Sequence, residues 1–237
     1  MRRTWYRVVA ILAAAGGMAG WFLLPGRSNA QRIDDTTQPV RQTETAIQSG
    51  ELTFPYLIPE SGLVIEGFMS YSGTYMEDGT DDAVSNVTGL MLYNPTERMV
   101  RFGAFALEQD SKQLYFFVYC LPPESRCLVL EKNRQQYTKQ SITQCRQLNV
   151  RWDYQELNTE QVQFVGFGKT LTVVNLGQEQ RHVALWYKQY DRKEECFLGG
   201  VAYSAYAFRL KPQEQRTLTP EYYDAASAKV VAVELEG

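Results

Sequence analysis

The pattern of apolar and polar positions changes twice along the chain. Residues Val8 to Leu24 form an apolar run without charge, and residues 25–50 are rich in Gln, Thr, Ser and charged side chains. After residue 50, short apolar runs alternate with polar residues and turn formers to the end of the chain. These three patterns predict a membrane-directed segment (1–24), a flexible linker (25–50) and a strand-rich globular region.

The strand-like runs fall into two groups. The first group covers 63–69, 88–93, 100–107, 113–120 and 127–130, followed by connecting strands at 152–157 and 162–165. The second group covers 171–174, 182–190, 199–208, 215–218 and 229–235. No run after residue 50 has a sustained helical period, so we predict an all-β fold. It consists of two tandem immunoglobulin-like β-sandwich domains, 51–157 and 158–237, after an N-terminal transmembrane helix.

A short internal repeat supports two related domains. LMLYN (90–94) and LTVVN (171–175) are strands that end in Asn, and each is followed by a predicted strand pair. The pairs end in LPPE (121–124) and LKPQE (210–214), and each of these leads into a further strand. Asn at a strand end tolerates the left-handed conformation and closes a turn, which gives the repeat a physical reason.

The second group also carries a family resemblance. Asn175, the stretch HVALWYKQYDRKEECFLGG (182–200) and the stretch FRLKPQEQRTLTP (208–220) resemble the FxLYD-type immunoglobulin-like modules of bacterial exported proteins. Gln213 stands where that family usually has Gly. Through residues 77–87 and 127–133, the whole chain is similar to uncharacterised membrane-anchored exported proteins of Gram-positive anaerobes. These resemblances imply a fold and a location but no activity.

The apolar run at the N-terminus predicts export. Arg2, Arg3 and Arg7 precede Val8 to Leu24, so the positive-inside rule leaves the N-terminus in the cytoplasm and the rest outside. We expect a single-pass cell-membrane protein with extracytoplasmic C-terminal domains. The alternative is a cleaved signal peptide, because Ser28-Asn29-Ala30 offers a cleavage site, and the protein would then be secreted.

Charge and composition narrow the possible partners. The net charge is −3 and no long block of like charge occurs, so the basic surface of a nucleic-acid-binding protein is missing. Aromatic residues make up 13% of the chain, which favours a folded β-rich protein over a disordered one.

An acidic cluster is the one candidate metal site. Glu77, Asp78, Asp81 and Asp82 surround Gly79, and hard cations such as calcium bind carboxylate oxygens. The spacing matches no EF-hand loop. The alternative interpretation is a solvated Asp-Gly turn.

Four cysteines lie in the exported part, at positions 120, 127, 145 and 196. Cys120 and Cys127 flank a six-residue turn, so pairing of their strands as a hairpin would allow a disulfide. The alternative is that all four are buried thiols. No pair has the C-x-x-C spacing of a redox or zinc motif, and we expect no cofactor.

No hydrolase motif accompanies the sole histidine. His182 begins a predicted strand, and no G-x-S-x-G sequence is present, so we interpret it as a surface residue. Glycoside hydrolysis needs two carboxyl groups at a set distance in space, and no fixed spacing in the sequence identifies such a pair. An exported hydrolase therefore stays an alternative.

Aromatic residues in the second group could form a contact surface. Trp186, Tyr190 and Tyr203 are the candidates for stacking on a glycan or a protein partner. The alternative is ordinary cross-strand packing. We therefore predict a non-enzymatic, membrane-anchored interaction or structural module. Two alternatives remain: an accessory subunit of an envelope secretion or assembly complex, and an exported hydrolase with scattered carboxylates.

Overall fold

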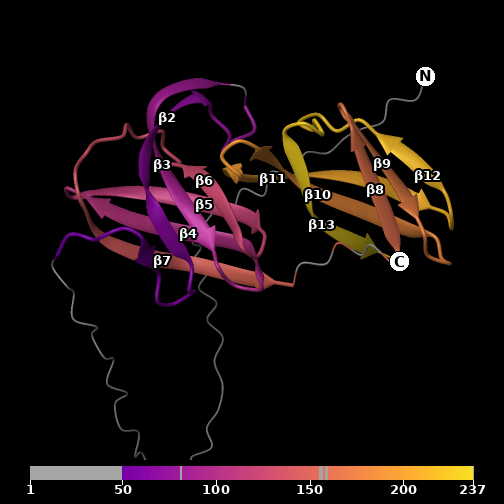
Figure 1. Ribbon diagram of the computed structural model, residues 1–237, viewed down its shortest axis with the longest axis horizontal. Helices are drawn as coiled ribbons and strands as arrows, with labels where there is room; N and C mark the ends of the chain where they lie inside the picture. The colour runs from indigo at the N-terminus through magenta and orange to yellow at the C-terminus, as the bar shows by residue number, and fades with distance from the viewer. Residues whose placement is uncertain (1–49, 81, 155–156, 158–159, 237) are drawn as a thin grey trace, which may run out of the picture. The chain divides into compact units, whose positions relative to one another are not determined.

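A computed structural model describes residues 50–80, 82–154, 157 and 160–236, and this part of the chain is all-β, with no helix (Figure 1). The strands are β1 (Tyr56–Leu57), β2 (Val64–Thr74), β3 (Ala83–Asn94), β4 (Met99–Gln109), β5 (Lys112–Leu121), β6 (Ser125–Leu130), β7 (Ile142–Asp153), β8 (Val162–Phe167), β9 (Thr170–Asn175), β10 (Arg181–Asp191), β11 (Cys196–Leu210), β12 (Gln215–Leu218) and β13 (Ala228–Glu236). The all-β prediction is confirmed.

The strand order repeats between the first half of this region (β2–β7) and the second half (β8–β13). In the first half, β2-β3-β6 form one run of paired strands and β5-β4-β7 form another. In the second half, β8-β9-β12 and β11-β10-β13 repeat this order. Figure 1 shows the two sets of strands as the indigo-to-pink and the orange-to-yellow parts of the ribbon.

Each half buries apolar side chains between its two runs of strands. In the first half, Leu92 of β3 and Phe116 of β5 belong to the same buried cluster. In the second half, Val173 of β9 and Leu185 of β10 do the same. Packing of one sheet on another through alternate inward-facing residues is the arrangement of a β-sandwich.

Two buried asparagines explain the sequence repeat. Asn94 and Asn175 end β3 and β9, and both are 0% exposed. The Asn94 side-chain amide donates to the carbonyl oxygen of Leu121 at 3.3 Å, and that of Asn175 donates to the carbonyl oxygen of Leu210 at 2.9 Å. In each half, the side chain of the Asn at the strand end therefore hydrogen-bonds the backbone of the Leu that begins the later turn.

The turns after these leucines share a backbone conformation. Glu124 has φ +50° and Gln213 has φ +59°, which is the left-handed region that glycine adopts most easily. Gln213 is the residue that stands in place of the Gly expected from the family resemblance. The backbone of this turn keeps the left-handed conformation without the glycine.

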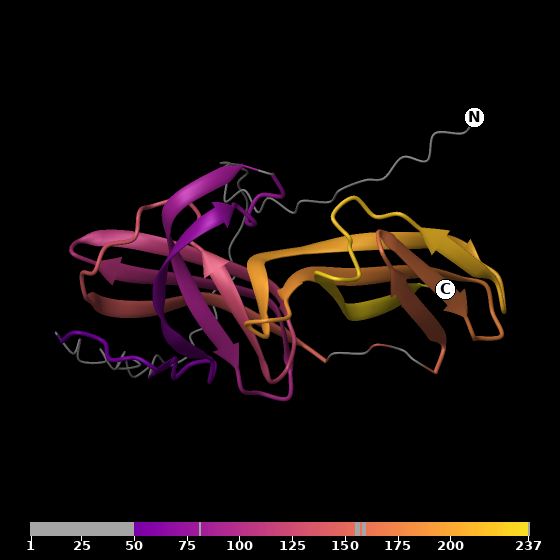
Figure 2. The same cartoon turned by 45° about the horizontal axis from the view of Figure 1, so that its top comes forward.

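One strand connects the two halves. The first residues of β11 pair in parallel with β6, Phe197 with Cys127 and Leu198 with Leu128. The rest of β11 pairs with β10, so the seven strands β1-β2-β3-β6-β11-β10-β13 form one sheet. In Figure 2 the orange ribbon of β11 runs from beside the pink strands into the second half. Residues 49–237 accordingly form one compact unit.

The predicted anchor (Val8 to Leu24) and nearly all of the predicted linker lie outside the described residues. Within the described part of the chain, no helix is long and apolar enough to cross a membrane.

Candidate functional site at the junction of the two halves

The junction is built on an irregular segment of β11. Leu198 pairs with Gln189 and Tyr203 pairs with Tyr187, so the four residues 199–202 lie opposite Lys188 alone. Such a bulge turns backbone carbonyls and N–H groups away from the regular ladder. The groups that it frees are held by two charged side chains, Lys188 and Glu77.

Lys188 supplies a positive charge inside the protein. The residue is 0% exposed. Its Nζ donates to the carbonyl oxygens of Gly199 at 3.1 Å, Gly200 at 3.1 Å and Val201 at 2.8 Å. An ammonium group has three donors, and each has a partner here, which is the condition under which a lysine can be buried.

Glu77 binds both halves at once. Its two carboxylate oxygens accept from the N–H of Leu130 in β6 at 2.6 Å and from the N–H of Gly200 in β11 at 2.7 Å. Burial of the carboxyl group raises its pKa to about 7, while these two N–H groups and the charge of Lys188 pull the pKa down. Although part of Glu77 is exposed, its carboxyl group is hydrogen-bonded within the junction.

Two consecutive glycines make the bend possible. Gly199 has φ +74°, and a side chain at Gly200 would overlap the carbonyl oxygen of Phe117. The first position needs a left-handed backbone and the second needs close contact with β5. The Gly-Gly pair therefore lets β11 pass from one half to the other.

The cysteines are free thiols in the structure. The predicted Cys120–Cys127 disulfide assumed a hairpin, but β5 and β6 lie in different sheets and are not paired. The Sγ atom of Cys127 instead donates to the carbonyl oxygen of Gly199 at 3.1 Å, and burial raises the pKa of this thiol to about 12. A protonated, hydrogen-bonded thiol is a poor nucleophile.

Of the acidic residues considered as a calcium site, Asp78 and Asp82 come together on an arginine, and Glu77 does not join them. Asp78 and Asp82 both accept from Nη2 of Arg134, each at 2.8 Å, so a guanidinium already lies between them. Glu77 points to the junction, and Asp81 lies outside the described residues. In the part of the chain that the structure describes, no three metal-binding side chains form a group.

The predicted aromatic contact residues are dispersed. Trp186 and Tyr190 pack against the buried cluster of the first half, whereas Tyr203 packs against that of the second half. All three are partly buried. Trp186 also lies under the guanidinium of Arg101, 4.6 Å from its ring centre. The two faces of β10 contact two different cores, which the sequence alone did not indicate.

A different aromatic group is exposed on the second half. Phe208 is 59% exposed, and its ring stacks on Tyr206 with centres 5.7 Å apart. His182 meets Phe208 edge to face, also at 5.7 Å. We call these three side chains the aromatic row. The sequence placed His182 at the surface, whereas Phe208 was predicted only as the end of the strand 199–208 and not as a contact residue.

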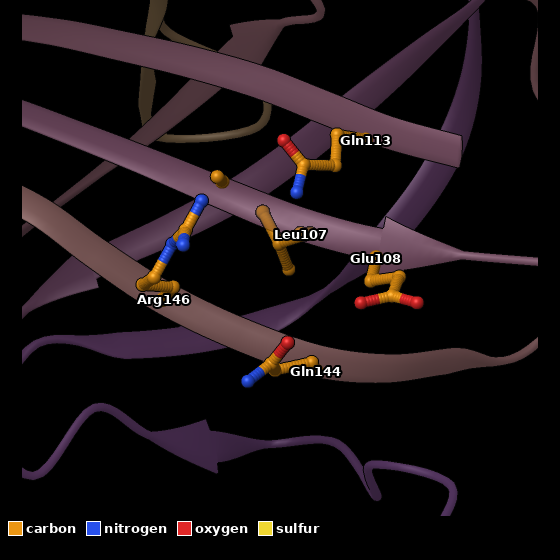
Figure 3. A pocket seen from close by; sticks show the side chains of 6 residues that line it. Leu107, Glu108, Gln113, Gln144 and Arg146 are labelled. Atoms are coloured by element: carbon orange, nitrogen blue, oxygen red, sulfur yellow. The ribbon is translucent and has the colours of Figure 1, made fainter. Parts of the chain in front are cut away.

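A small hollow lies on the first half between β4, β5 and β7 (Figure 3). Its volume is about 10 Å³, which is room for about one water molecule. The residues that line it are Ala106, Leu107, Glu108, Gln113, Gln144 and Arg146. This hollow cannot hold an organic substrate.

The central role of Lys188 was not predicted from the sequence. The available signal was a lysine within the largely apolar strand 182–190, followed by a Gly-Gly pair at 199–200. A charged residue in such a strand needs partners, and consecutive glycines can supply free carbonyls.

Comparison with known proteins gives no family. No protein-family model, curated protein or solved structure matches this chain.

Proposed function

We propose that this chain is a non-enzymatic interaction module, held at the cell membrane by its N-terminal segment, with its β-rich region outside the cytoplasm. The β-rich region would consist of two immunoglobulin-like sandwiches that share β11. The repeated strand order and the paired roles of Asn94 and Asn175 support this reading.

The observation that carries the proposal is the contrast between engaged reactive groups and the exposed aromatic row. Lys188, Glu77 and Cys127 are all bonded to backbone groups at the junction. In contrast, Phe208 presents its ring to solvent. Exposed aromatic residues on a rigid strand are frequent anchors of protein interfaces.

The surroundings of the aromatic row suit a protein partner. On β10, Ala184 pairs with Tyr206 and places a methyl group beside the aromatic row. On the next strand, Glu236 pairs with His182, which places a carboxylate at the border of the row. An apolar centre with a polar border is the usual arrangement of a protein interface.

The location can be tested with two fusions to the full chain. Alkaline phosphatase folds only outside the cytoplasm, and a cytoplasmic fluorescent protein matures only inside. We expect phosphatase activity, no fluorescence, and retention of the fusion in carbonate-washed membranes. A variant without residues 8–24 is the control and should lose phosphatase activity. Fluorescence from the full-length fusion would refute the proposed location.

The interaction can be tested in intact cells with a photo-crosslinking amino acid at Phe208. We expect one dominant crosslinked protein from this position. The same amino acid at Leu148, which is 44% exposed on β7 of the first half, is the matched control and should give only diffuse products. Equal crosslinking patterns at both positions would count against the aromatic row as the binding surface.

A further inference from the structure

The outer edge of β8 is a bare strand edge. Among the strands that the structure describes, β8 pairs only with β9 in the order β12-β9-β8, and the register runs without a shift from Val162–Asn175 to Phe167–Thr170. Val165 is 56% exposed and Phe167 is 84% exposed. The strand contains no charged residue and no proline.

The other edge strands of the described region carry the usual protection against pairing. Charged residues occur at Lys112 in β5, Arg146, Arg151 and Asp153 in β7, Arg216 in β12, and Lys229, Glu234 and Glu236 in β13. β1 lacks charge but is only two residues long. Since charges, bulges and shortness are the devices that keep edges from pairing, β8 stands apart from the rest.

The first half shows what this edge can accept. β2 is the counterpart of β8 in the repeated strand order, and its outer edge is covered by β1, through the pairs Tyr56–Ile65 and Leu57–Val64. β8 has no such cover in the described structure. The edge of the first half that corresponds to the β8 edge is therefore already paired with an antiparallel strand.

The free edge offers a regular set of hydrogen-bonding groups. The N–H of Leu176 donates to the carbonyl oxygen of Gln161 at 2.8 Å, which fixes the phase of the β8–β9 ladder. Because bonded and non-bonded pairs alternate in an antiparallel ladder, the backbone groups of Val162, Phe164 and Gly166 point away from β9. These groups are available to a further strand.

The outer face beside this edge is also uncharged. Cross-strand rows on this face are Gln163, Val174 and Gln215, then Val165, Thr172 and Thr217, then Phe167 and Thr170. A partner strand added to β8 would extend this face without placing a charge next to it.

We propose that β8 pairs antiparallel with β8 of a second copy of this chain, so that two three-stranded sheets become one six-stranded sheet. In the register that covers most exposed apolar surface, Val165 lies opposite Val165 of the second copy. Gln163 then lies opposite Phe167. Alternation makes Val165–Val165 a non-bonded pair, whose Cα atoms would be about 4.5 Å apart.

Charge favours a second copy as the occupant. Antiparallel self-pairing is symmetric, so the central residue meets its own copy, and a charge at that position would oppose a like charge. β8 avoids this because Val162–Phe167 has no charge. Its two exposed apolar residues, Val165 and Phe167, would be covered together.

Association of the full chain in mild detergent tests the proposal. By analytical ultracentrifugation between about 1 and about 100 µM, we expect a monomer–dimer equilibrium. Val165→Lys should weaken dimerisation at least about tenfold, because it places two ammonium groups opposite each other at the two-fold axis. Leu148→Lys on β7 of the first half is the matched control, since Leu148 is 44% exposed, and it should leave the dimer intact. A monomeric wild type, or an equal effect of the two variants, would overturn the proposal.

Disulfide trapping tests the register and separates edge pairing from face packing. Val165→Cys should give a covalent dimer on mild oxidation, since non-bonded cross-strand pairs have the spacing that a disulfide needs. Thr172→Cys lies on the same face one strand further in, so its two sulfurs would be three strand spacings apart, about 14 Å. Crosslinking at Thr172 in place of Val165 would show face packing and contradict edge pairing. Circular dichroism confirms that each variant is folded.

Discussion

The two halves of the β-rich region use the same strand order and the same buried asparagine but end differently at their edges. The first half covers the outer edge of β2 with β1, while no described strand covers the outer edge of β8 in the second half. The first half also keeps β5 short, at 10 residues, while its counterpart β11 has 15 residues and enters the other half. The strand order and the buried asparagine are common to both halves, whereas β1 and the longer β11 each belong to one half alone.

The shared features hold each half together, and the differences are where the halves meet other strands. Asn94 and Asn175 fix the shared turn. β11 and β8 are where the second half departs from the first, one inside the molecule and one at its surface. Substitutions at the shared features should act alike in both halves, and substitutions at the added features should not.

The largest effect is expected at the bend that only β11 has. Gly200→Ala places a methyl group on the carbonyl oxygen of Phe117, so β11 must move away from β5. We expect the free energy of unfolding in urea to fall by about 3 kcal/mol.

The matched control for this bend is Gly67→Ala in β2, where an added methyl group meets nothing within 4 Å. Its effect should stay below about 0.5 kcal/mol. Equal effects of the two alanine variants would contradict the close contact at Gly200.

The buried asparagines test whether the halves share one device. Asn94→Ala and Asn175→Ala each leave buried carbonyl oxygens without a donor, and we expect a loss of about 2 to 3 kcal/mol for each by urea unfolding. Asn94 should be the more costly because its amide also donates to Pro122 at 3.0 Å. Asn149→Ala on the exposed surface of β7 is the control, with little change expected. A large loss of stability in one half alone would contradict the same structural role for the two asparagines.

Glu77 makes the stability of the junction depend on pH. Its pKa is raised in the folded protein to about 7 from its ordinary 4.5. Between these values the folded carboxyl keeps a proton that the unfolded one has lost, so the contribution to stability falls as pH rises through this window.

Glu77→Gln should remove this part of the pH dependence, which we expect to be about 2 kcal/mol between pH 5 and pH 8. Urea unfolding of both proteins at the two pH values measures it. Glu194→Gln on the exposed surface is the control and should keep the wild-type slope. A wild-type slope in Glu77→Gln would assign the pH dependence to other groups.

The smallest effect is expected at His182. His182→Ala removes only the edge contact with Phe208, so the stability should change by about 0.5 kcal/mol, measured by thermal unfolding. If the crosslink from position 208 persists in this variant, His182 is a border residue of the aromatic row. A loss of more than about 2 kcal/mol would mean that His182 has a structural role beyond this ring contact.

The alternation of apolar residues was enough to predict most strands. The run 215–218 coincides with β12, and 171–174 lies within β9. β7 (Ile142–Asp153) was missed over most of its length because Gln, Arg and Asn occupy its outward positions, and many of its side chains are exposed. A half-exposed edge strand leaves little apolar signal for a period-two pattern.

The junction could not be predicted from the sequence because its residues are far apart in the chain. Glu77 and Gly200 are 123 residues apart. The spacing of nearby residues in the sequence does not reveal such a long-range contact. It also made the acidic residues 77–82 look like one cluster. The Cys120–Cys127 pairing was inferred from a short turn, but that turn crosses between sheets, which periodicity does not reveal.

The double membership of β11 has a consequence for the order of folding. The first half ends its own strands at Asp153, yet its sheet gains Phe197 and Leu198 only after a further forty-odd residues have been made. During synthesis, the edge of β6 in the first half therefore stays open until the second half has begun to fold. The two halves are expected to reach their final state together, and a chain cut between them should leave both pieces incomplete.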